Sequence, residues 1–237
     1  MSTYVLVHGA WHGAWCWDKV VPLLEAAGHT AVAVDLPGHG NDTTPIEDLT
    51  LDDYVDRVSE VLDNQPEPAV LVGHSHGGAT ISMVAERRPE MVKTLVYVCA
   101  FMLRDDQSIS DVVAAGEQSM VRRNMVSSDD GRSIVIRDEA VREGLFGDCT
   151  DDDFAWARSH LVPEPATSRT TRVAVTDERF GRVPRFYVEC LRDNAIPLSV
   201  QRWMCAASPC KKVFTMDTGH SPFISAPQEL VGHLLAV

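Results

Sequence analysis

Residues 68–86, PAVLVGHSHGGATISMVAE, decide the fold, because they predict a buried strand, a sharp turn and a helix in immediate succession. Residues 69–72 form a short apolar, β-branched run, and residues 79–86 have the composition of a helix. Between them, residues 73–77 form the G-x-S-x-G pattern. A strand that turns abruptly into a helix holds a serine hydroxyl clear of the backbone, so we expect Ser75 to be a nucleophile.

The same stretch predicts part of a site for a developing oxyanion. Gly73 and Gly77 leave room around the serine, and the start of the helix leaves the His76 amide free. The glycine-rich, aromatic sequence HGAWHGAWCW at residues 8–17 follows the first expected strand. We expect the Ala10 amide in this loop to be the second oxyanion donor.

Strands and helices alternate along the chain, which indicates a parallel sheet with right-handed crossovers. Strands are expected at Thr3–Val7, Thr30–Val34, 69–72, 93–99, 185–191 and Lys212–Met216. Helices are expected at 17–27, 50–62, 79–86, Leu198–Ala207 and 227–235. A ligand site in such a fold lies beyond the carboxyl ends of the strands, where Ala10 and Ser75 both fall.

Alternation stops between residues 101 and 182, a polar segment that splits the expected core into residues 1–100 and 183–237. We expect this segment to be a mostly helical lid over the active edge of the sheet, since long insertions in compact domains are usually functional. The alternative is a solvent-exposed segment without a functional role, whose apolar residues only anchor it to the core. Candidates for the apolar underside are Phe101, Met102, Phe146, Phe154, Trp156 and Leu161. Candidates for substrate contact are Trp11, Phe101 and Trp156.

A serine nucleophile needs a histidine base, and the base needs a carboxylate that orients it. In sheets of this type the acid and then the histidine follow late strands, and Asp193 and His220 match that order. Asp217, Asp177 and Glu189 remain possible acids on sequence alone.

The other histidines and the composition argue against further cofactors and partners. His74 and His76 flank a serine without a nearby set of carboxylate or cysteine ligands, so we expect no metal. We call residues 8–17 the oxyanion loop. His8 and His12 are expected to be structural hydrogen-bonding groups around it. The formal charge of −13 opposes binding to nucleic acid or to an anionic membrane surface, which leaves a small molecule as the expected partner.

We expect the protein to be soluble and to be located in the cytoplasm. The six cysteines show no C-x-x-C pairing and are interpreted as reduced thiols. We expect no signal peptide, because the N-terminus enters a strand almost at once, and no apolar run approaches the length of a membrane span. Nothing in the sequence indicates an oligomeric state.

Five motifs carry a family resemblance: VLVHGAWHGAWCW, DLPGHG, GHSHGG, LRDNAIPLSVQRWM and TGHSPFISAPQEL. They resemble the α/β-hydrolase superfamily and, more narrowly, the group of plant methylesterases and hydroxynitrile lyases with its bacterial esterase relatives. The resemblance spans nearly the whole chain and is looser through residues 101–182. It implies a nucleophile, a base, an acid and two oxyanion amides, namely Ser75, His220, Asp193 and the amides of Ala10 and His76.

One departure from the group bears on the reaction. The lyases resemble each other in placing a lysine directly after the catalytic histidine, whereas Ser221 and Pro222 stand here. We therefore expect a serine carboxylesterase that hydrolyses small to medium hydrophobic or aromatic esters through an acyl-enzyme and without a cofactor. The alternatives are a C–C lyase similar to the hydroxynitrile lyases, an acyltransferase, and a small-molecule receptor with a vestigial triad.

Overall fold

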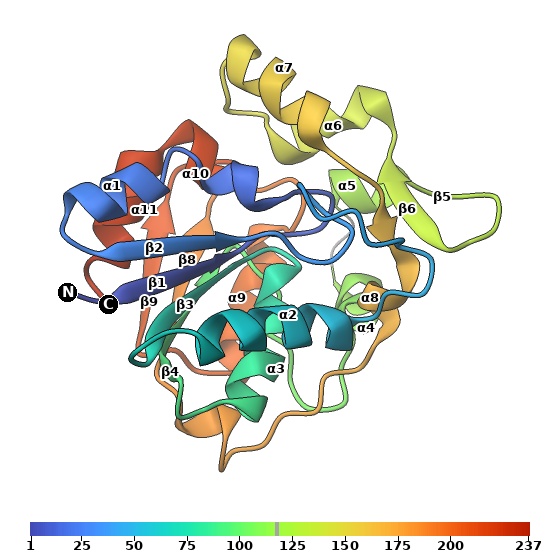
Figure 1. The fold of residues 1–237 in the computed structure, drawn as a ribbon. Helices are drawn as coiled ribbons and strands as arrows, with labels where there is room; N and C mark the ends of the chain where they lie inside the picture. Colours follow the sequence, from blue (N-terminus) through green and yellow to red (C-terminus); the bar gives the residue numbers. More distant parts are fainter. Residues whose placement is uncertain (117–118) are drawn as a thin grey trace.

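The computed structural model describes residues 1–116 and 119–237 and contains a six-stranded parallel sheet (Figure 1). The strands lie in the order β2-β1-β3-β4-β8-β9. Their bounds are β1 Thr3–Val7, β2 Thr30–Val34, β3 Ala69–His74, β4 Val92–Val98, β8 Arg185–Cys190 and β9 Lys212–Met216. The parallel α/β-hydrolase sheet expected from the sequence is confirmed.

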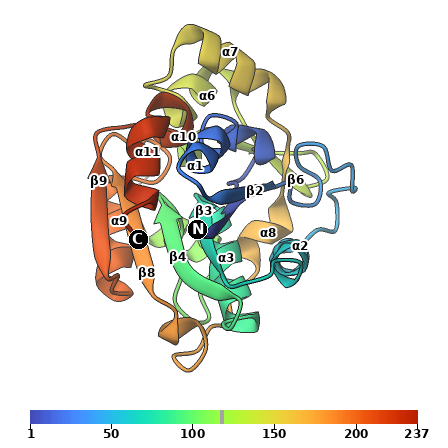
Figure 2. The same ribbon diagram turned by 60° about the vertical axis from the view of Figure 1, so that its left-hand side comes forward.

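Helices cover both faces of this sheet. Because alternate side chains of a strand point to opposite faces, Val5 packs with one set of helices and Leu6 with the other. The first set comprises α2 (Leu51–Asp63), α3 (Gly77–Arg87) and α9 (Leu198–Ala207). The second comprises α1 (Val21–Ala26) and α11 (Pro227–Leu234), which lie side by side in Figure 2, together with the short α10 (Pro222–Ser225). Within the described ranges, no helix has the length and apolar character needed to cross a bilayer.

Local sequence explains most element boundaries. Helix α2 begins after Thr50, whose amide donates to Asp53 Oδ2 at 2.7 Å in a capping box. The helix expected over residues 17–27 is shorter than predicted: a 3-10 helix, η1 (Ala14–Trp17), comes first, and α1 begins only at Val21. Pro22 accounts for this, because proline lacks an N–H and is tolerated only in the first turn of a helix.

The 101–182 segment carries α6 and α7 above the sheet in Figure 1, and its last residues run back along the core against α3. Its mostly helical character is not confirmed, because long loops and a three-stranded antiparallel sheet, β5-β6-β7, lie between its helices. The strands are β5 Met125–Ser127, β6 Ser133–Ile136 and β7 Glu164–Pro165. The helices are α4 Ile109–Ala115, α5 Met120–Arg123, α6 Asp138–Leu145, α7 Asp151–His160, α8 Ala166–Thr170 and the 3-10 helix η2 Phe180–Arg182.

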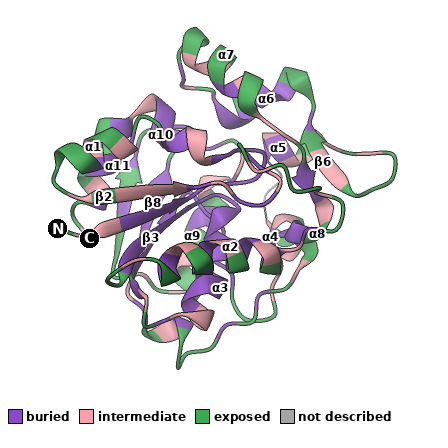
Figure 3. Ribbon diagram, viewed as in Figure 1, coloured by how far each residue is buried: buried purple, intermediate pink, exposed green. Residues whose placement is uncertain are grey.

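Buried residues extend from the sheet into this segment. Strand β3 is buried along its whole length, and Figure 3 shows the buried residues running from the sheet toward α5 and α8. Helix α8 contacts α2 of the core and α4 of the segment. The end of the segment is therefore fixed to the core, whereas α7 exposes much of its surface.

Candidate active site

Ser75 occupies a strained turn between β3 and α3. Its φ is +51°, a left-handed value that is uncommon for a residue other than glycine. Its carbonyl accepts hydrogen bonds from Gly78 N at 3.1 Å and Phe101 N at 2.9 Å, which hold the turn. A Cβ at Gly73 would lie 2.7 Å from Gly77 O, so a larger residue would disrupt this approach. The backbone thus places Ser75 as a G-x-S-x-G motif requires.

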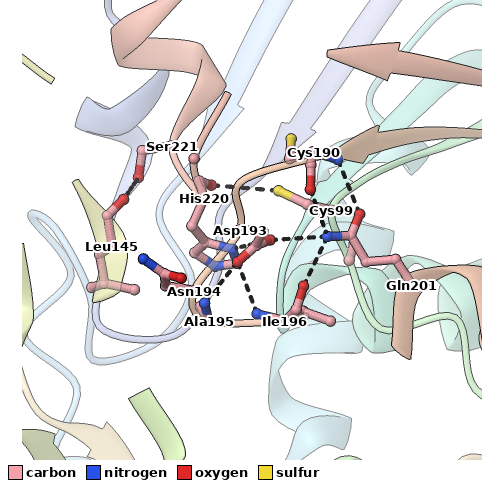
Figure 4. Close-up of polar contacts among 12 residues, drawn as sticks. Cys99, Leu145, Cys190, Asp193, Asn194, Ala195, Ile196, Gln201, His220 and Ser221 are labelled. Atoms are coloured by element: carbon pink, nitrogen blue, oxygen red, sulfur yellow. Dashed lines mark hydrogen bonds and ion pairs between the residues drawn. The ribbon is translucent and has the colours of Figure 1, made fainter. Parts of the chain in front are cut away.

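His220 and Asp193 meet in the loops that follow β9 and β8 (Figure 4). His220 Nδ1 lies 2.8 Å from Asp193 Oδ2, and both side chains are buried. With a carboxylate as acceptor, Nδ1 is the donor, and in the neutral imidazole Nε2 then carries no proton. This tautomer is the one that a general base requires.

Asp193 is itself held in place by its surroundings. Its Oδ1 accepts hydrogen bonds from the amides of Ala195 at 2.7 Å and Ile196 at 2.8 Å. Gln201 Nε2, on α9, donates to Oδ2 at 3.3 Å (Figure 4). Hydrogen bonds to a charged acceptor are stronger than those between neutral groups, so the carboxylate has one preferred orientation toward His220.

The three other acids that the sequence left open lie elsewhere. Asp217 pairs with Arg192 at 2.9 Å, and Glu189 pairs with Arg202 at 2.9 Å. Asp177 is exposed. Asp193 is therefore the carboxylate that contacts His220.

Ser75 and His220 lie on the same edge of the sheet, but no direct hydrogen bond joins them. His74, next to Ser75, donates from Nε2 to His220 O at 2.9 Å. In the part of the chain that the structure describes, the Ser75 hydroxyl has no hydrogen-bond partner. His220 lines a neighbouring cavity of about 210 Å³ with Glu143 and Asp148. Long or absent catalytic hydrogen bonds are common in unliganded enzymes, so this geometry is compatible with a catalytic pair.

The two expected oxyanion donors are free of protein acceptors. Among the hydrogen bonds of the described residues, none comes from the backbone amide of Ala10 or from that of His76. His76 is the N-cap residue of α3, where amides lack partners within the helix. Two unpaired amides near a nucleophile can bind the negative charge of a tetrahedral intermediate.

Trp11, the next residue in the oxyanion loop, is held by three contacts from the 101–182 segment. Its φ of +65° is left-handed and therefore strained. Its Nε1 donates to Ile134 O at 2.8 Å, and its carbonyl accepts from Val162 N at 3.0 Å. Its amide donates to Glu164 Oε2 at 3.2 Å. The segment thus fixes the conformation of the oxyanion loop.

Glu164 is the centre of a buried polar network. Its carboxylate accepts from His39 Nε2 at 2.9 Å, Tyr54 OH at 3.2 Å and Ser168 Oγ at 2.6 Å. Burial raises the pKa of Glu164, but His39, His76 and the hydrogen bonds outweigh it, so this pKa lies below its ordinary value. Burial lowers the pKa of His39, but Glu164 outweighs it and the pKa is raised. The two groups favour each other's charged form.

Burial keeps two further histidines of the site, His12 and His76, neutral at neutral pH. Burial lowers the pKa of His12 to about 4 and that of His76 to about 4. The 3.7 Å approach of His76 Nε2 to Glu164 Oε1 is therefore not an ion pair at neutral pH. His12 Nδ1 contacts Ala10 O at 2.7 Å, and His8 Nε2 accepts from Leu36 N at 3.1 Å. Both contacts are of the structural kind expected for these two residues.

A narrow cavity of about 30 Å³ opens next to Ser75. This volume is well below the ~300 Å³ at which small-molecule sites usually begin. Trp11 and Phe101 are among its lining residues. Trp156, the third expected substrate contact, lies on α7 with 37% of its surface exposed and packs on Trp15 at 5.2 Å between ring centroids. The cavity is lined by Trp11, Ser75, Phe101, Val113, Ser119, Val121, Arg122, Met125, Arg169, Ala195 and Ile196.

Three charged residues of the site escaped prediction from the sequence: Arg122, Glu164 and Arg169. Charged residues in a polar segment usually lie at the surface, and no motif surrounds these three. The one available signal was local: Glu164 stands between Pro163 and Pro165, which prevent a helix from continuing through it.

His74, Cys99 and His220 form the one described group whose spacing could suit a metal ion, with their ligand atoms within 4.8 Å of one another. Each is engaged otherwise. His220 Nδ1 contacts Asp193, while His74 Nε2 and Cys99 Sγ both donate to His220 O (Figure 4 shows the Cys99 contact). Burial raises the pKa of the Cys99 thiol, which disfavours the thiolate that a metal requires. We interpret this cluster as structural.

Comparison with known proteins identifies the family. Residues 4–233 match the alpha/beta hydrolase family. The chain is 35% identical to methylesterase 1 of Arabidopsis thaliana over 251 residues, covering 99% of this chain and 95% of that protein. It is 33% identical to the putative chloroplastic methylesterase 11 of Arabidopsis thaliana over 246 residues, covering 99% of this chain and 63% of that protein.

A solved structure agrees with these matches. The crystal structure of a pyrethroid hydrolase from Sphingobium faniae JZ-2 superposes with a TM-score of 0.89 at 29% identity, covering 99% of this chain and 96% of that one. The family is thus shown by sequence along nearly the whole chain, and the fold by structure. The chain belongs to the alpha/beta hydrolase family, as an esterase-like hydrolase similar to the methylesterases.

Proposed function

We propose that this protein is a serine carboxylesterase with Ser75 as nucleophile, His220 as base and Asp193 as the acid that orients the base. The observation that carries the proposal is the 2.8 Å contact between His220 Nδ1 and Asp193 Oδ2, on the sheet edge where the Ser75 turn lies. The names of the methylesterase and pyrethroid hydrolase relatives support ester hydrolysis.

The reaction proceeds in two halves. Ser75 Oγ attacks the ester carbonyl carbon while His220 Nε2 takes the hydroxyl proton, and the amides of Ala10 and His76 stabilise the oxyanion. The bond to the alcohol oxygen then breaks, the alcohol leaves with the proton from His220, and an acyl-enzyme remains. A water molecule repeats the sequence, which releases the acid and restores the serine. No cofactor takes part.

The 101–182 segment acts in this proposal as a lid on a core of residues 1–100 and 183–237. The cavity of about 30 Å³ at Ser75 is too small for an ester, so side chains of the segment must move to admit substrate. Trp11 also lines a second cavity of about 190 Å³, which residues of the segment complete. Its walls include Ile136, Val141 and Leu161, which favour a hydrophobic or aromatic group.

The test compares the wild type with Ser75→Ala on a short-chain p-nitrophenyl ester near neutral pH. We expect turnover by the wild type and background release by the variant, with both proteins folded by circular dichroism. Release of aldehyde from a cyanohydrin without ester turnover would support the lyase instead. That outcome is disfavoured because Ser221 stands where the lyases carry lysine, and its Oγ donates to Leu145 O at 2.8 Å. Tight binding of a small molecule without turnover would support the receptor.

A further inference from the structure

Arg169 carries a positive charge in the interior of the protein. It lies on α8 and is 6% exposed, yet its guanidinium forms no hydrogen bond or ion pair with any residue in the described ranges. Its recorded contact is with the Trp11 ring, whose centroid is 5.8 Å from Cζ. Arginine stays protonated in proteins and carries five N–H donors. An uncompensated buried charge is costly, so its persistence calls for an explanation.

The nearest buried acid does not fill this role. Glu164 interacts with Arg169 electrostatically, but no atoms of the two approach within ion-pair distance. The Glu164 carboxylate is already occupied by His39, Tyr54 and Ser168. His39 also supplies a compensating positive charge to that carboxylate. The donors of Arg169 are therefore left for another acceptor.

The cavity at Ser75 is the place where that acceptor can lie. Arg169 and Arg122 both line it, and the described lining residues include no carboxylate. Arg122 donates from Nη1 to Val113 O, and within residues 1–116 and 119–237 its other guanidinium nitrogens have no hydrogen-bond acceptor. The remaining walls are mostly apolar. Two arginines that line one small, mostly apolar space beside Ser75 favour an anionic ligand there.

We propose that Arg169, assisted by Arg122, binds a carboxylate carried by the ester substrate. Guanidinium and carboxylate match in shape and form paired, charge-assisted hydrogen bonds, which also orient the ester carbonyl toward Ser75. The inference rests on the proposed function and narrows its substrates to hydrophobic or aromatic esters with one free carboxylate. The overall charge of −13 repels anions at long range, so such selectivity must arise from these local cations.

The first test uses two esters that differ only in charge, methyl (3-carboxyphenyl)acetate and methyl (3-carbamoylphenyl)acetate. The wild type should prefer the carboxylate ester by about 10-fold or more in kcat/KM. Arg169→Met should lower kcat/KM for that ester by about 10- to 100-fold, largely through KM, and change the amide ester by less than about 3-fold. Arg169→Lys, which keeps the charge, should retain part of the preference. Arg132→Met removes an exposed arginine of the same segment and should change neither rate.

The second test measures binding without turnover. Titration of methyl (3-carboxyphenyl)acetate into Ser75→Ala by calorimetry should give a Kd at least about 10-fold tighter than in Ser75→Ala/Arg169→Met. Charge-dependent binding without hydrolysis by the wild type would refute the esterase and leave the subsite standing. Equal handling of the two esters by the wild type, or equal binding with and without Arg169, would overturn the subsite while the esterase could stand. Failure of the wild type to bind or hydrolyse either ester would also overturn the carboxylate subsite.

Discussion

Replacing Glu164 with alanine tests whether the 101–182 segment supports the oxyanion loop. The change removes an acceptor shared by four buried donors, on Trp11, His39, Tyr54 and Ser168. Removing one partner of a buried ion pair costs about 3–5 kcal/mol, because the other partner stays buried and unpaired. For a chain of this size, we expect the Tm to fall by about 6–20 °C. Differential scanning calorimetry at pH 7 measures it.

The same change should lower catalysis separately from stability. Without Glu164, the Trp11 amide has no acceptor and the left-handed φ of +65° loses one of its three supports. The neighbouring Ala10 amide then becomes less well oriented. Loss of a whole oxyanion donor costs about 10²- to 10³-fold in kcat, so loosening one should cost about 10- to 100-fold. Because the donor acts in the transition state, kcat should fall more than KM rises. Hydrolysis of p-nitrophenyl acetate well below the lowered Tm reports it.

Two variants make the result decisive. Glu178→Ala removes an exposed acid from the same segment and should change neither Tm nor kcat. Glu164→Gln keeps the shape and one acceptor oxygen, so it should fall between the wild type and Glu164→Ala. A Glu164→Ala protein that is destabilised but keeps full kcat would refute the coupling to the oxyanion loop. A Tm within about 2 °C of the wild type would refute the energetic argument as a whole.

Two further predictions concern the proposed catalytic acid and the response to pH. Asp193→Asn should lower kcat by about 10²- to 10⁴-fold with the fold retained, because the amide can donate to His220 Nδ1 and so favour the wrong tautomer of His220. Asp217→Asn is the matched control. Comparable losses of kcat in both variants would contradict the assignment of Asp193. Stability to urea should fall as the pH drops from 6.5 to 4, since His12 and His76, with folded pKa values of about 4 against 6.5, take up protons on unfolding. The raised pKa of His39 has the opposite effect, because the stability that its charged form contributes is lost as the pH rises through that pKa. This single effect is smaller than the combined effect of His12 and His76. If stability instead rises on acidification, His12 and His76 are not buried in the neutral form.

The core of the fold could be predicted from sequence because its signals are local. Thr3–Val7 and Thr30–Val34 are β-branched runs whose side chains suit a parallel sheet, and both strands have the predicted bounds. Likewise, Leu198–Ala207 follows a proline that suits a helix start. The prediction of the first helix was wrong at its N-terminus: the helix begins at Val21, because Pro22 is tolerated only in the first turn.

The strands and buried charged residues of the 101–182 segment could not be predicted from the sequence, for a physical reason. Its strands are two to four residues long, too short for an alternating pattern to appear. The burial of Glu164 depends on His39 and Tyr54, which lie more than a hundred residues earlier in the chain. Arg169 owes its burial to the same long-range packing. The motif-bearing residues Ser75, Asp193 and His220 could be proposed because each lies in the turn or loop that follows a strand of the core, and their roles remain a prediction.

These contacts restrict how a substrate can enter. If the whole 101–182 segment lifted as one body, Val162 and Glu164 would leave Trp11, and the oxyanion loop would lose its support when the ester arrives. Strand β7 and α8 are also tied to the core through His39 and Tyr54. The other wall of the cavity lies on α5 and β5, which pack against α6 and β6 of the same segment. We infer that entry occurs by movement of α5 and β5 while β7 and α8 stay in place, so that the lid opens without dismantling the oxyanion loop.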